Sequence, residues 1–294
     1  MLPLRDALRS GPVLLMDGAM ATELFKKGLG LNEPPERWNL ERPDAVREVH
    51  ESYLAAGATC ILANTFQANP SALAKHGLQN KLEEIIRKGI QIARDASGAD
   101  RYVLASIGPA GVAYDASFLD RVVPALEGVD GILLETFGDV DVMWLVKYGL
   151  LPRLADQNIP VLVSLSFARS PSGAVGTLAG QSAEAIARLA DQYGVSALGL
   201  NCGKDMQLAD ATAVIASYRK TTGLPLFARP NAGTPEETSS GLRFPLQAPD
   251  FAAWVSQVMR EGVRMIGGCC GTSAETIAAM HDVLDQWSGA TEVW

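Results

Sequence analysis

Short apolar runs that end in small or polar residues recur along the chain, and each is followed by a stretch with helical periodicity. The runs span residues 13–19, 60–66, 102–109, 131–137, 161–167, 197–203, 225–233 and 264–271. A continuous apolar run is typical of a parallel strand, because helices then cover both faces of the sheet. We therefore predict eight parallel strands separated by helices.

The segments between these strands carry apolar residues three or four positions apart, which predicts helices with one buried face. The clearest stripes are Leu82, Ile85, Ile86, Gly89 and Ala93; Val46, Val49, Tyr53 and Leu54, closed by Gly57; and Leu208, Ala211, Ile215 and Tyr218. Thr272 and Glu275 have capping-box spacing, so we predict a helix that starts just after the double cysteine at residues 269–270. Pro124 predicts that the helix between the third and fourth strands is short or broken.

Eight strands that alternate with helices predict an α/β protein with a (β/α)8 TIM barrel fold, as a single domain over residues 1–294. A doubly wound open sheet is the alternative, because periodicity alone does not reveal closure. In a barrel the carboxyl ends of all strands meet at one mouth. We place three loops on that face, at residues 26–39, 167–180 and 233–249.

Composition narrows the range of functions. The chain has 294 residues, of which 48% are hydrophobic and 20% charged, and its net charge of −8 disfavours a nucleic-acid partner, which needs a basic patch. No apolar stretch approaches the ~20 residues of a membrane helix, and charges interrupt the N-terminus before a signal-peptide core could form. We expect a soluble cytoplasmic protein without nucleic-acid or membrane partners.

The four cysteines are too few for a disulfide framework in a chain of this length. Cys202 and the adjacent pair Cys269 and Cys270 end two predicted strands, so a barrel would bring them to the same mouth. Thiolates are favoured ligands of Zn²⁺, and three protein ligands leave one tetrahedral position open, as in catalytic zinc sites. We predict a zinc site on these three residues, which are also the predicted catalytic residues. Cys60, at the start of a strand, is expected to be a buried apolar residue.

Neighbouring residues of a strand point to opposite faces, so Cys269 and Cys270 bind one ion only if the strand ends or bends there. Gly267, Gly268 and Gly271 permit such a bend. Three thiolates and Zn²⁺ carry a net charge of −1, and a fourth thiolate from a substrate makes it −2. The metal therefore both deprotonates a substrate thiol and leaves it nucleophilic. The alternative is that all these cysteines are small buried hydrophobic residues.

Two carboxylates, Asp17 and Glu135, also end apolar runs at the predicted mouth. Together they would attract a cation such as the α-ammonium of an amino acid, and the alternative is a helix cap or a salt bridge at a loop base. Gly18 and Ala19 could offer backbone N–H groups to a carboxylate. Asn201, beside Cys202, completes the candidate substrate-binding residues.

Asn231 is a candidate for the fourth zinc position before a substrate arrives. The alternative is that its side chain braces a tight turn. The three histidines fall in helical or loop segments and receive no role. The chain has no GxGxxG and no P-loop, so a nucleotide cofactor is not indicated.

In the order of its motifs the chain resembles the homocysteine S-methyltransferase family, through the segments DGAMATEL, PPERWNLERPDAV, ANTFQAN, LLETF, GLNCG, RPNAG and GGCCGT. The resemblance implies a (β/α)8 barrel, zinc on Cys202, Cys269 and Cys270, and homocysteine held by Asp17 and Glu135. It also implies a role in methionine biosynthesis.

Family members differ in their methyl donor, which is betaine, S-methylmethionine, S-adenosylmethionine or methylcobalamin. GGCCGT and RPNAG are most similar to the homocysteine-binding module of cobalamin-dependent methionine synthase, which implies a separate corrinoid protein as partner. We expect zinc-dependent methylation of homocysteine to methionine, with methylcobalamin on a partner protein, S-methylmethionine or a betaine-like compound as donor. The alternatives are corrinoid-linked methyl transfer to another thiol and a non-catalytic subunit that binds zinc and thiols.

Overall fold

All eight predicted strands are present in the computed structural model, which describes residues 1–110, 114–238 and 241–291. They are β1 (Leu14–Leu15), β2 (Cys60–Ala63), β3 (Tyr102–Ile107), β4 (Gly131–Phe137), β5 (Val161–Leu165), β8 (Ala197–Cys202), β9 (Leu226–Pro230) and β12 (Met265–Ile266). They pair in parallel, in the order β1-β12-β9-β8-β5-β4-β3-β2.

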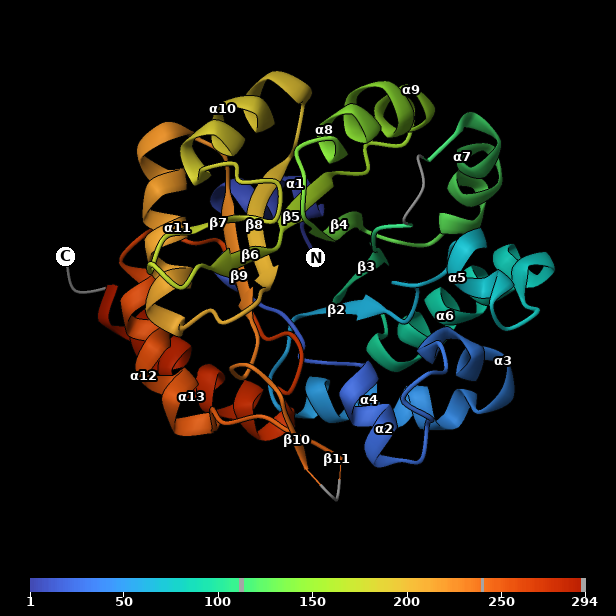
Figure 1. Ribbon diagram of the computed structural model, residues 1–294, viewed down its shortest axis with the longest axis horizontal. Coiled ribbons are helices and arrows are strands. Elements are labelled where there is room, and N and C mark those ends of the chain that lie inside the picture. Colours follow the sequence, from blue (N-terminus) through green and yellow to red (C-terminus); the bar gives the residue numbers. More distant parts are fainter. Residues whose placement is uncertain (111–113, 239–240, 292–294) are drawn as a thin grey trace.

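The two ends of this order meet, which makes the sheet a near-closed barrel. Met16, just after β1, forms a parallel bridge with Cys60 of β2. The Asp17 N–H donates to the Cys60 carbonyl at 3.0 Å, and the Thr59 N–H donates to the Leu15 carbonyl at 2.8 Å. Figure 1 shows the helices in a ring around these strands. The barrel prediction is confirmed, and the open-sheet alternative is wrong.

The helices begin and end close to the predicted stripes. They are α1 (Leu4–Ser10), α2 (Ala21–Lys26), α3 (Trp38–Glu41), α4 (Pro43–Ala55), α5 (Pro70–Ala74), α6 (Leu82–Ser97), α7 (Ala116–Val122), α8 (Val142–Trp144), α9 (Leu151–Arg153), α10 (Ala183–Tyr193), α11 (Leu208–Thr221), α12 (Ala248–Met259) and α13 (Ala274–Thr291). A π-helix (Leu145–Leu150) joins α8 to α9. As Pro124 predicts, α7 ends at Val122 and only a 3-10 turn, Val123–Leu126, follows.

The helix predicted to start just after the cysteine pair is present, but the capping box at Thr272 and Glu275 is wrong. The helix begins at Ala274, one residue later than that box requires. The Thr272 hydroxyl instead donates to the Cys269 carbonyl at 2.7 Å, and the Ser273 N–H donates to the Thr276 hydroxyl at 3.3 Å. The hydroxyl of Thr272 therefore stabilises the turn that holds the cysteine pair.

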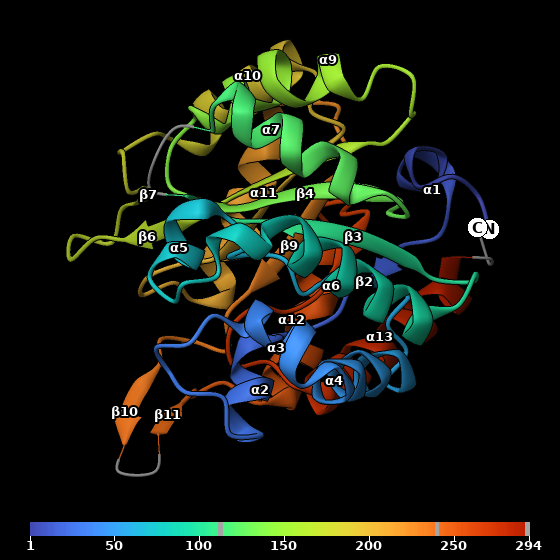
Figure 2. The ribbon, with the colours of Figure 1, turned by 90° about the vertical axis from the view of Figure 1, so that its right-hand side faces the viewer.

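Two of the three segments predicted as loops contain short antiparallel hairpins. β6 (Phe167–Arg169) pairs with β7 (Val175–Thr177), and β10 (Glu236–Thr238) pairs with β11 (Gly241–Arg243). Figure 2 shows both hairpins at one end of the barrel and α1 near the other end. The third segment, 26–39, contains a 3-10 turn, Pro35–Arg37, and the start of α3.

The core has two layers, as a barrel requires. The outer layer packs strands against the ring of helices, and the inner layer fills the barrel. Leu4 and Leu8 of α1 belong to the inner layer, so α1 covers the amino-terminal end of the strands. Cys60 is 0% exposed in this layer, which confirms the expectation that it is a buried apolar residue. Among the helices of the described residues, none combines the length and apolar character needed to cross a membrane.

Candidate active site and metal centre

The three cysteines predicted to bind zinc form one cluster. Cys202 is the last residue of β8, and Cys269 and Cys270 lie just beyond β12. Their sulfur atoms all lie within 4.8 Å of one another, and the Cys202 and Cys270 sulfurs are 3.8 Å apart. Tetrahedral zinc with Zn–S bonds of ~2.3 Å requires sulfur atoms ~3.8 Å apart. The thiols therefore fit a zinc ion, and a fourth direction is left for another ligand.

The backbone at the cluster adopts conformations that ordinary strand residues avoid. Cys202 has φ of +57°, a left-handed value that is costly for a residue with a side chain. Gly271 has φ of +81°, and a Cβ on Gly268 would lie 2.3 Å from the Thr272 hydroxyl oxygen. The bend predicted from the glycines is therefore present. The Cys269 N–H donates to the Pro230 carbonyl at 2.9 Å, which anchors the bend to β9.

The three thiols interact strongly with one another. Hydrogen bonds from the other two thiols lower the pKa of Cys202, whereas its proximity raises the pKa of Cys269 to about 11 and that of Cys270 further. The ionisation of one thiol therefore opposes the ionisation of the other two. A divalent cation that binds all three as thiolates displaces the remaining protons, so metal binding releases protons.

Asp17 and Glu135 lie at the mouth as predicted, but a third residue joins them. Arg229 of β9 donates from one terminal nitrogen to Glu135 at 3.0 Å and from the other to Asp17 at 3.1 Å. All three side chains are at least nine-tenths buried. Arg229 was missed by the sequence reasoning, although a charged residue inside the apolar run LFARP is itself a signal. A buried guanidinium requires carboxylate partners.

The oxygens of this pair are already hydrogen-bonded within the protein. The Leu62 N–H donates to Asp17 Oδ2 at 2.8 Å, and the Ser106 hydroxyl donates to Glu135 Oε1 at 2.5 Å. Burial raises the pKa of Asp17 to about 7 and that of Glu135 above its usual range, and Arg229 opposes both shifts. With both carboxylates ionised, the pair and Arg229 carry a net charge of −1.

Asn201 is engaged within the protein. Its Oδ1 accepts from the Thr136 N–H at 2.8 Å and from the Ser164 hydroxyl at 2.6 Å. Its Nδ2 donates to Glu135 Oε2 at 3.0 Å and lies 3.6 Å from the Cys269 sulfur. Asn201 thus connects the acidic pair to the metal ligands. These contacts favour a positioning role, and its predicted contact with substrate stays a prediction.

The turn after Asp17 presents backbone donors. Among the described residues, neither the Gly18 N–H nor the Ala19 N–H has an acceptor, so both remain available to a carboxylate. A Cβ on Gly18 would lie 2.8 Å from the Tyr53 ring and from the Thr272 hydroxyl oxygen. Only glycine fits at this position.

Asn231 follows the end of β9 and faces the cluster. Its Nδ2 donates to the Gly203 carbonyl at 3.1 Å, and it also hydrogen-bonds to Cys202. Its Oδ1 is buried and accepts no hydrogen bond. An unpartnered buried amide oxygen beside three thiols is an additional ligand atom that a metal could use.

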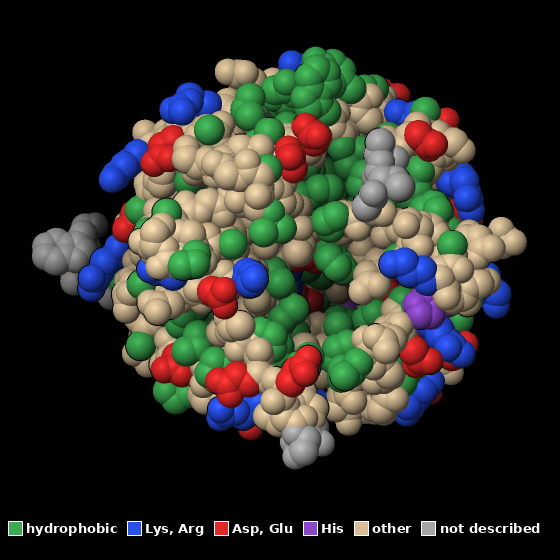
Figure 3. All heavy atoms as spheres, viewed as in Figure 1, with side chains coloured by type: hydrophobic (Ala, Val, Ile, Leu, Met, Phe, Trp, Pro, Cys, Tyr) green, Lys and Arg blue, Asp and Glu red, His purple; other side chains and the backbone are tan. Residues whose placement is uncertain are grey.

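A cavity of about 260 Å³ lies at the barrel mouth, and Asn201 and Asn231 are not among the residues that line it. The space-filling view shows this face hollowed near its centre, with acidic side chains visible in the depth (Figure 3). The lining includes the three cysteines, Asp17, Glu135, Arg229 and a residue to which the sequence reasoning gave no role, Glu36. The volume lies at the low end for small-molecule sites, which suits an amino acid.

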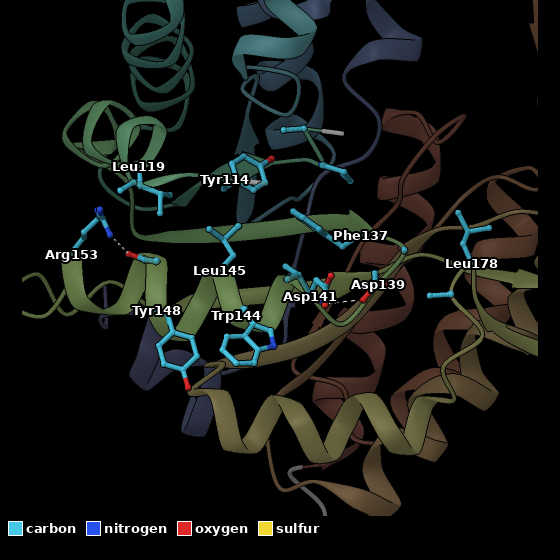
Figure 4. Close-up of a pocket in the computed structure, with 17 residues that line it drawn as sticks. Tyr114, Leu119, Phe137, Asp139, Asp141, Trp144, Leu145, Tyr148, Arg153 and Leu178 are labelled. Carbon is cyan, nitrogen blue, oxygen red and sulfur yellow. Dashed lines mark hydrogen bonds between the residues drawn. The ribbon is translucent and has the colours of Figure 1, made fainter. Parts of the chain in front are cut away.

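A larger groove of about 1110 Å³ lies beside this cavity and contains none of the cysteines. Figure 4 shows Tyr114, Leu119 and Phe137 along it, with the ring of Trp144 on α8 and the ring of Tyr148 on the π-helix nearby. Phe137 follows Thr136, which lines the cysteine cavity. The groove and the cavity therefore flank the same strand end.

Comparison with known proteins finds relatives that match most of the chain. A family model described as Homocysteine S-methyltransferase matches residues 14–284. The homocysteine S-methyltransferase of Escherichia coli is 30% identical over 317 residues, which cover 95% of this chain and 97% of that protein. The methionine synthase of Mycobacterium leprae is 30% identical over 292 residues, 90% of this chain but 24% of that protein. This chain thus spans about a quarter of that relative's length.

A solved structure is also similar to this chain. The metallated form of the homocysteine methyltransferase MmuM from Escherichia coli has a TM-score of 0.75 and 27% identity with this chain. The alignment covers 96% of this chain and 99% of that one.

Proposed function

The chain belongs to the homocysteine S-methyltransferase family of enzymes, and we propose that it methylates homocysteine to methionine with a zinc ion on Cys202, Cys269 and Cys270. The observation that carries this proposal is the spacing of the three sulfurs beside an acidic, amino-acid-sized cavity. Bound zinc supplies one thing: it lowers the pKa of the substrate thiol, so that the sulfur is a thiolate at neutral pH.

The protein's own residues hold the rest of the substrate. The net charge of −1 on Asp17, Glu135 and Arg229 attracts the α-ammonium group toward the depth of the cavity. The free N–H groups of Gly18 and Ala19 donate hydrogen bonds to its carboxylate. The thiol end then points at the cysteine cluster. These contacts fix the sulfur for in-line attack on a methyl group that enters from the open mouth.

We propose Asn231 Oδ1 as the fourth ligand before substrate arrives, because it is buried and accepts no hydrogen bond. X-ray absorption of the substrate-free, zinc-loaded protein is expected to show three sulfur neighbours and one oxygen. Asn231→Ala replaces that oxygen by water and lowers zinc affinity by about tenfold to a hundredfold, as loss of a weak ligand or its support does. A shell of sulfur alone in the wild-type protein contradicts this assignment.

The second substrate of the proposed reaction is the methyl donor. We propose a methyl donor that enters from the groove beside Phe137, which is wide enough for a compound larger than homocysteine. Methylcobalamin on a partner protein and S-methylmethionine are the candidates, followed by betaine-like compounds. A screen of these donors with zinc-loaded protein and homocysteine is expected to give methionine with one of them.

The same screen with other thiols as acceptors tests the alternative, which is corrinoid-linked methyl transfer to a thiol other than homocysteine. Turnover only with a different thiol and a corrinoid protein means that homocysteine is the wrong acceptor. Membership in an enzyme family disfavours the non-catalytic subunit.

A further inference from the structure

Glu36 is a buried carboxylate at the mouth of the barrel. It lies in the 3-10 turn Pro35–Arg37 and is 1% exposed. The Gln67 N–H donates to its Oε1 at 2.6 Å. Its Oε2 is buried and accepts no hydrogen bond. Buried carboxylate oxygens are nearly always paired, so an unpaired one calls for a missing partner.

Glu36 also lacks a counter-ion within the described residues. Asp17 and Glu135 share the Arg229 guanidinium, whereas no lysine, arginine or histidine forms an ion pair with Glu36. Burial without a cation raises the pKa of Glu36 to about 7. A positively charged group beside it would reverse this shift and restore the ionised form.

The position of Glu36 connects it to the reaction. It lines the same cavity as the three cysteines. Its turn is held in place, because the Asn64 amide donates to the Pro35 carbonyl at 2.9 Å and the Asn39 amide donates to the Asn64 carbonyl at 2.8 Å. Glu36 is therefore held in the wall of the cavity, and its Oε2 is an unused acceptor.

We propose that Glu36 is a substrate-binding residue whose Oε2 pairs with a positively charged group of a molecule bound over the cysteines. The proposal rests on the proposed function, and it adds a cation subsite separate from Asp17 and Glu135. The oxygens of those two carboxylates already accept protein donors, so they act mainly through charge. Glu36 offers the unused lone pairs that a direct contact needs.

Two substrates could supply the cation. One is the α-ammonium of homocysteine, and the other is the charged centre of the methyl donor, a sulfonium or a quaternary ammonium. The two sources differ in which binding constant depends on Glu36. Glu36→Gln tests both, because it keeps the size of the side chain and an oxygen for the Gln67 N–H.

The first arm is calorimetry on the zinc-loaded protein with homocysteine and with 4-sulfanylbutanoic acid, which is homocysteine without its amino group. If the ammonium is the partner, Glu36→Gln weakens homocysteine binding by about tenfold to a hundredfold, the usual effect of losing a charged hydrogen bond. Binding of 4-sulfanylbutanoic acid is expected to change by less than about threefold, since it makes no such bond.

The second arm is the KM for S-methylmethionine at saturating homocysteine. If the cation belongs to the donor, Glu36→Gln raises this KM by about tenfold or more and leaves homocysteine binding unchanged. Glu36→Asp keeps the charge on a shorter side chain and is expected to lose less than Glu36→Gln in the affected arm. It also serves as the second variant if Glu36→Gln folds poorly.

Glu33→Gln is the matched control, because Glu33 lies in the same segment but is 39% exposed and pairs with Arg37. It is expected to leave both arms unchanged. If the wild-type protein binds both thiols and Glu36→Gln shifts neither arm, the Glu36 proposal is overturned and the zinc–thiol function stands. If the zinc-loaded wild-type protein binds neither thiol, both proposals fail.

Discussion

Replacing Cys269 or Cys270 by alanine is expected to abolish methyl transfer and most zinc binding. Each residue supplies one of only three thiolates whose sulfurs lie within 4.8 Å of one another. Two remaining ligands do not hold zinc against competing chelators, so affinity falls by at least about a thousandfold. Metal analysis after dialysis, together with a methionine assay, measures both effects.

Cys60→Ala is the matched control for this experiment. Cys60 is fully buried inside the barrel and belongs to the inner core layer, not to the cluster. It is expected to keep one zinc per chain and normal turnover, with a modest loss of stability from the smaller side chain. A Cys269→Ala, Cys270→Ala double variant with full zinc and normal turnover would contradict the proposed metal centre.

Replacing Arg229 by methionine is expected to lower the free energy of unfolding by about 3 to 5 kcal/mol at pH 7, because two buried carboxylates lose their shared cation. Urea unfolding measures this loss. Lys27→Met is the control, since its ion pair with Glu48 is solvent-exposed and is worth about 1 kcal/mol or less. An Arg229→Met variant as stable as Lys27→Met contradicts the role assigned to Arg229.

The loss of unfolding free energy caused by Arg229→Met is expected to depend on pH. Arg229 opposes the rise in the pKa values of Asp17 and Glu135, so its removal raises both further. A carboxyl whose pKa is higher in the folded than in the unfolded protein binds protons preferentially when folded. The stability that this carboxyl contributes is present at low pH and is lost as the pH rises through its pKa in the folded protein. The difference between variant and wild type is therefore expected to be smallest near pH 4 and largest above pH 7.

The strands and the cysteine cluster could be predicted because their signals are local. Residues such as Ile61 and Val163 stand in continuous apolar runs, which indicate buried parallel strands. Once eight such runs suggest a barrel, the fold itself brings Cys202 to the adjacent pair. The relation between distant cysteines follows from topology, and no side-chain detail is needed.

The remaining features depend on contacts that sequence does not specify. The pairing of Arg229 with Asp17 and Glu135 joins β9, β4 and the segment after β1, and no spacing rule connects them. The β6–β7 hairpin has three residues in each strand, too few for an alternating pattern to emerge. Thr272 has the right spacing for a cap, but its hydroxyl bonds to the Cys269 carbonyl. Tertiary contacts override local propensity in each case.

The environment of Glu36 is another feature that the sequence does not specify. In sequence it is one acidic residue within a polar loop, where solvent exposure is the usual outcome. In the folded protein its turn is bound to Asn64, and the carboxylate is buried in the cavity wall. Only the tertiary structure reveals that one of its oxygens lacks a partner.

The central claim is that the cysteine cluster binds zinc and that this zinc binds the thiol of homocysteine. X-ray absorption at the zinc edge, measured before and after homocysteine is added to the zinc-loaded protein, tests it most directly. We predict that the sulfur neighbours increase from three to four, with loss of the oxygen neighbour. A zinc shell that does not change when homocysteine is bound contradicts the account.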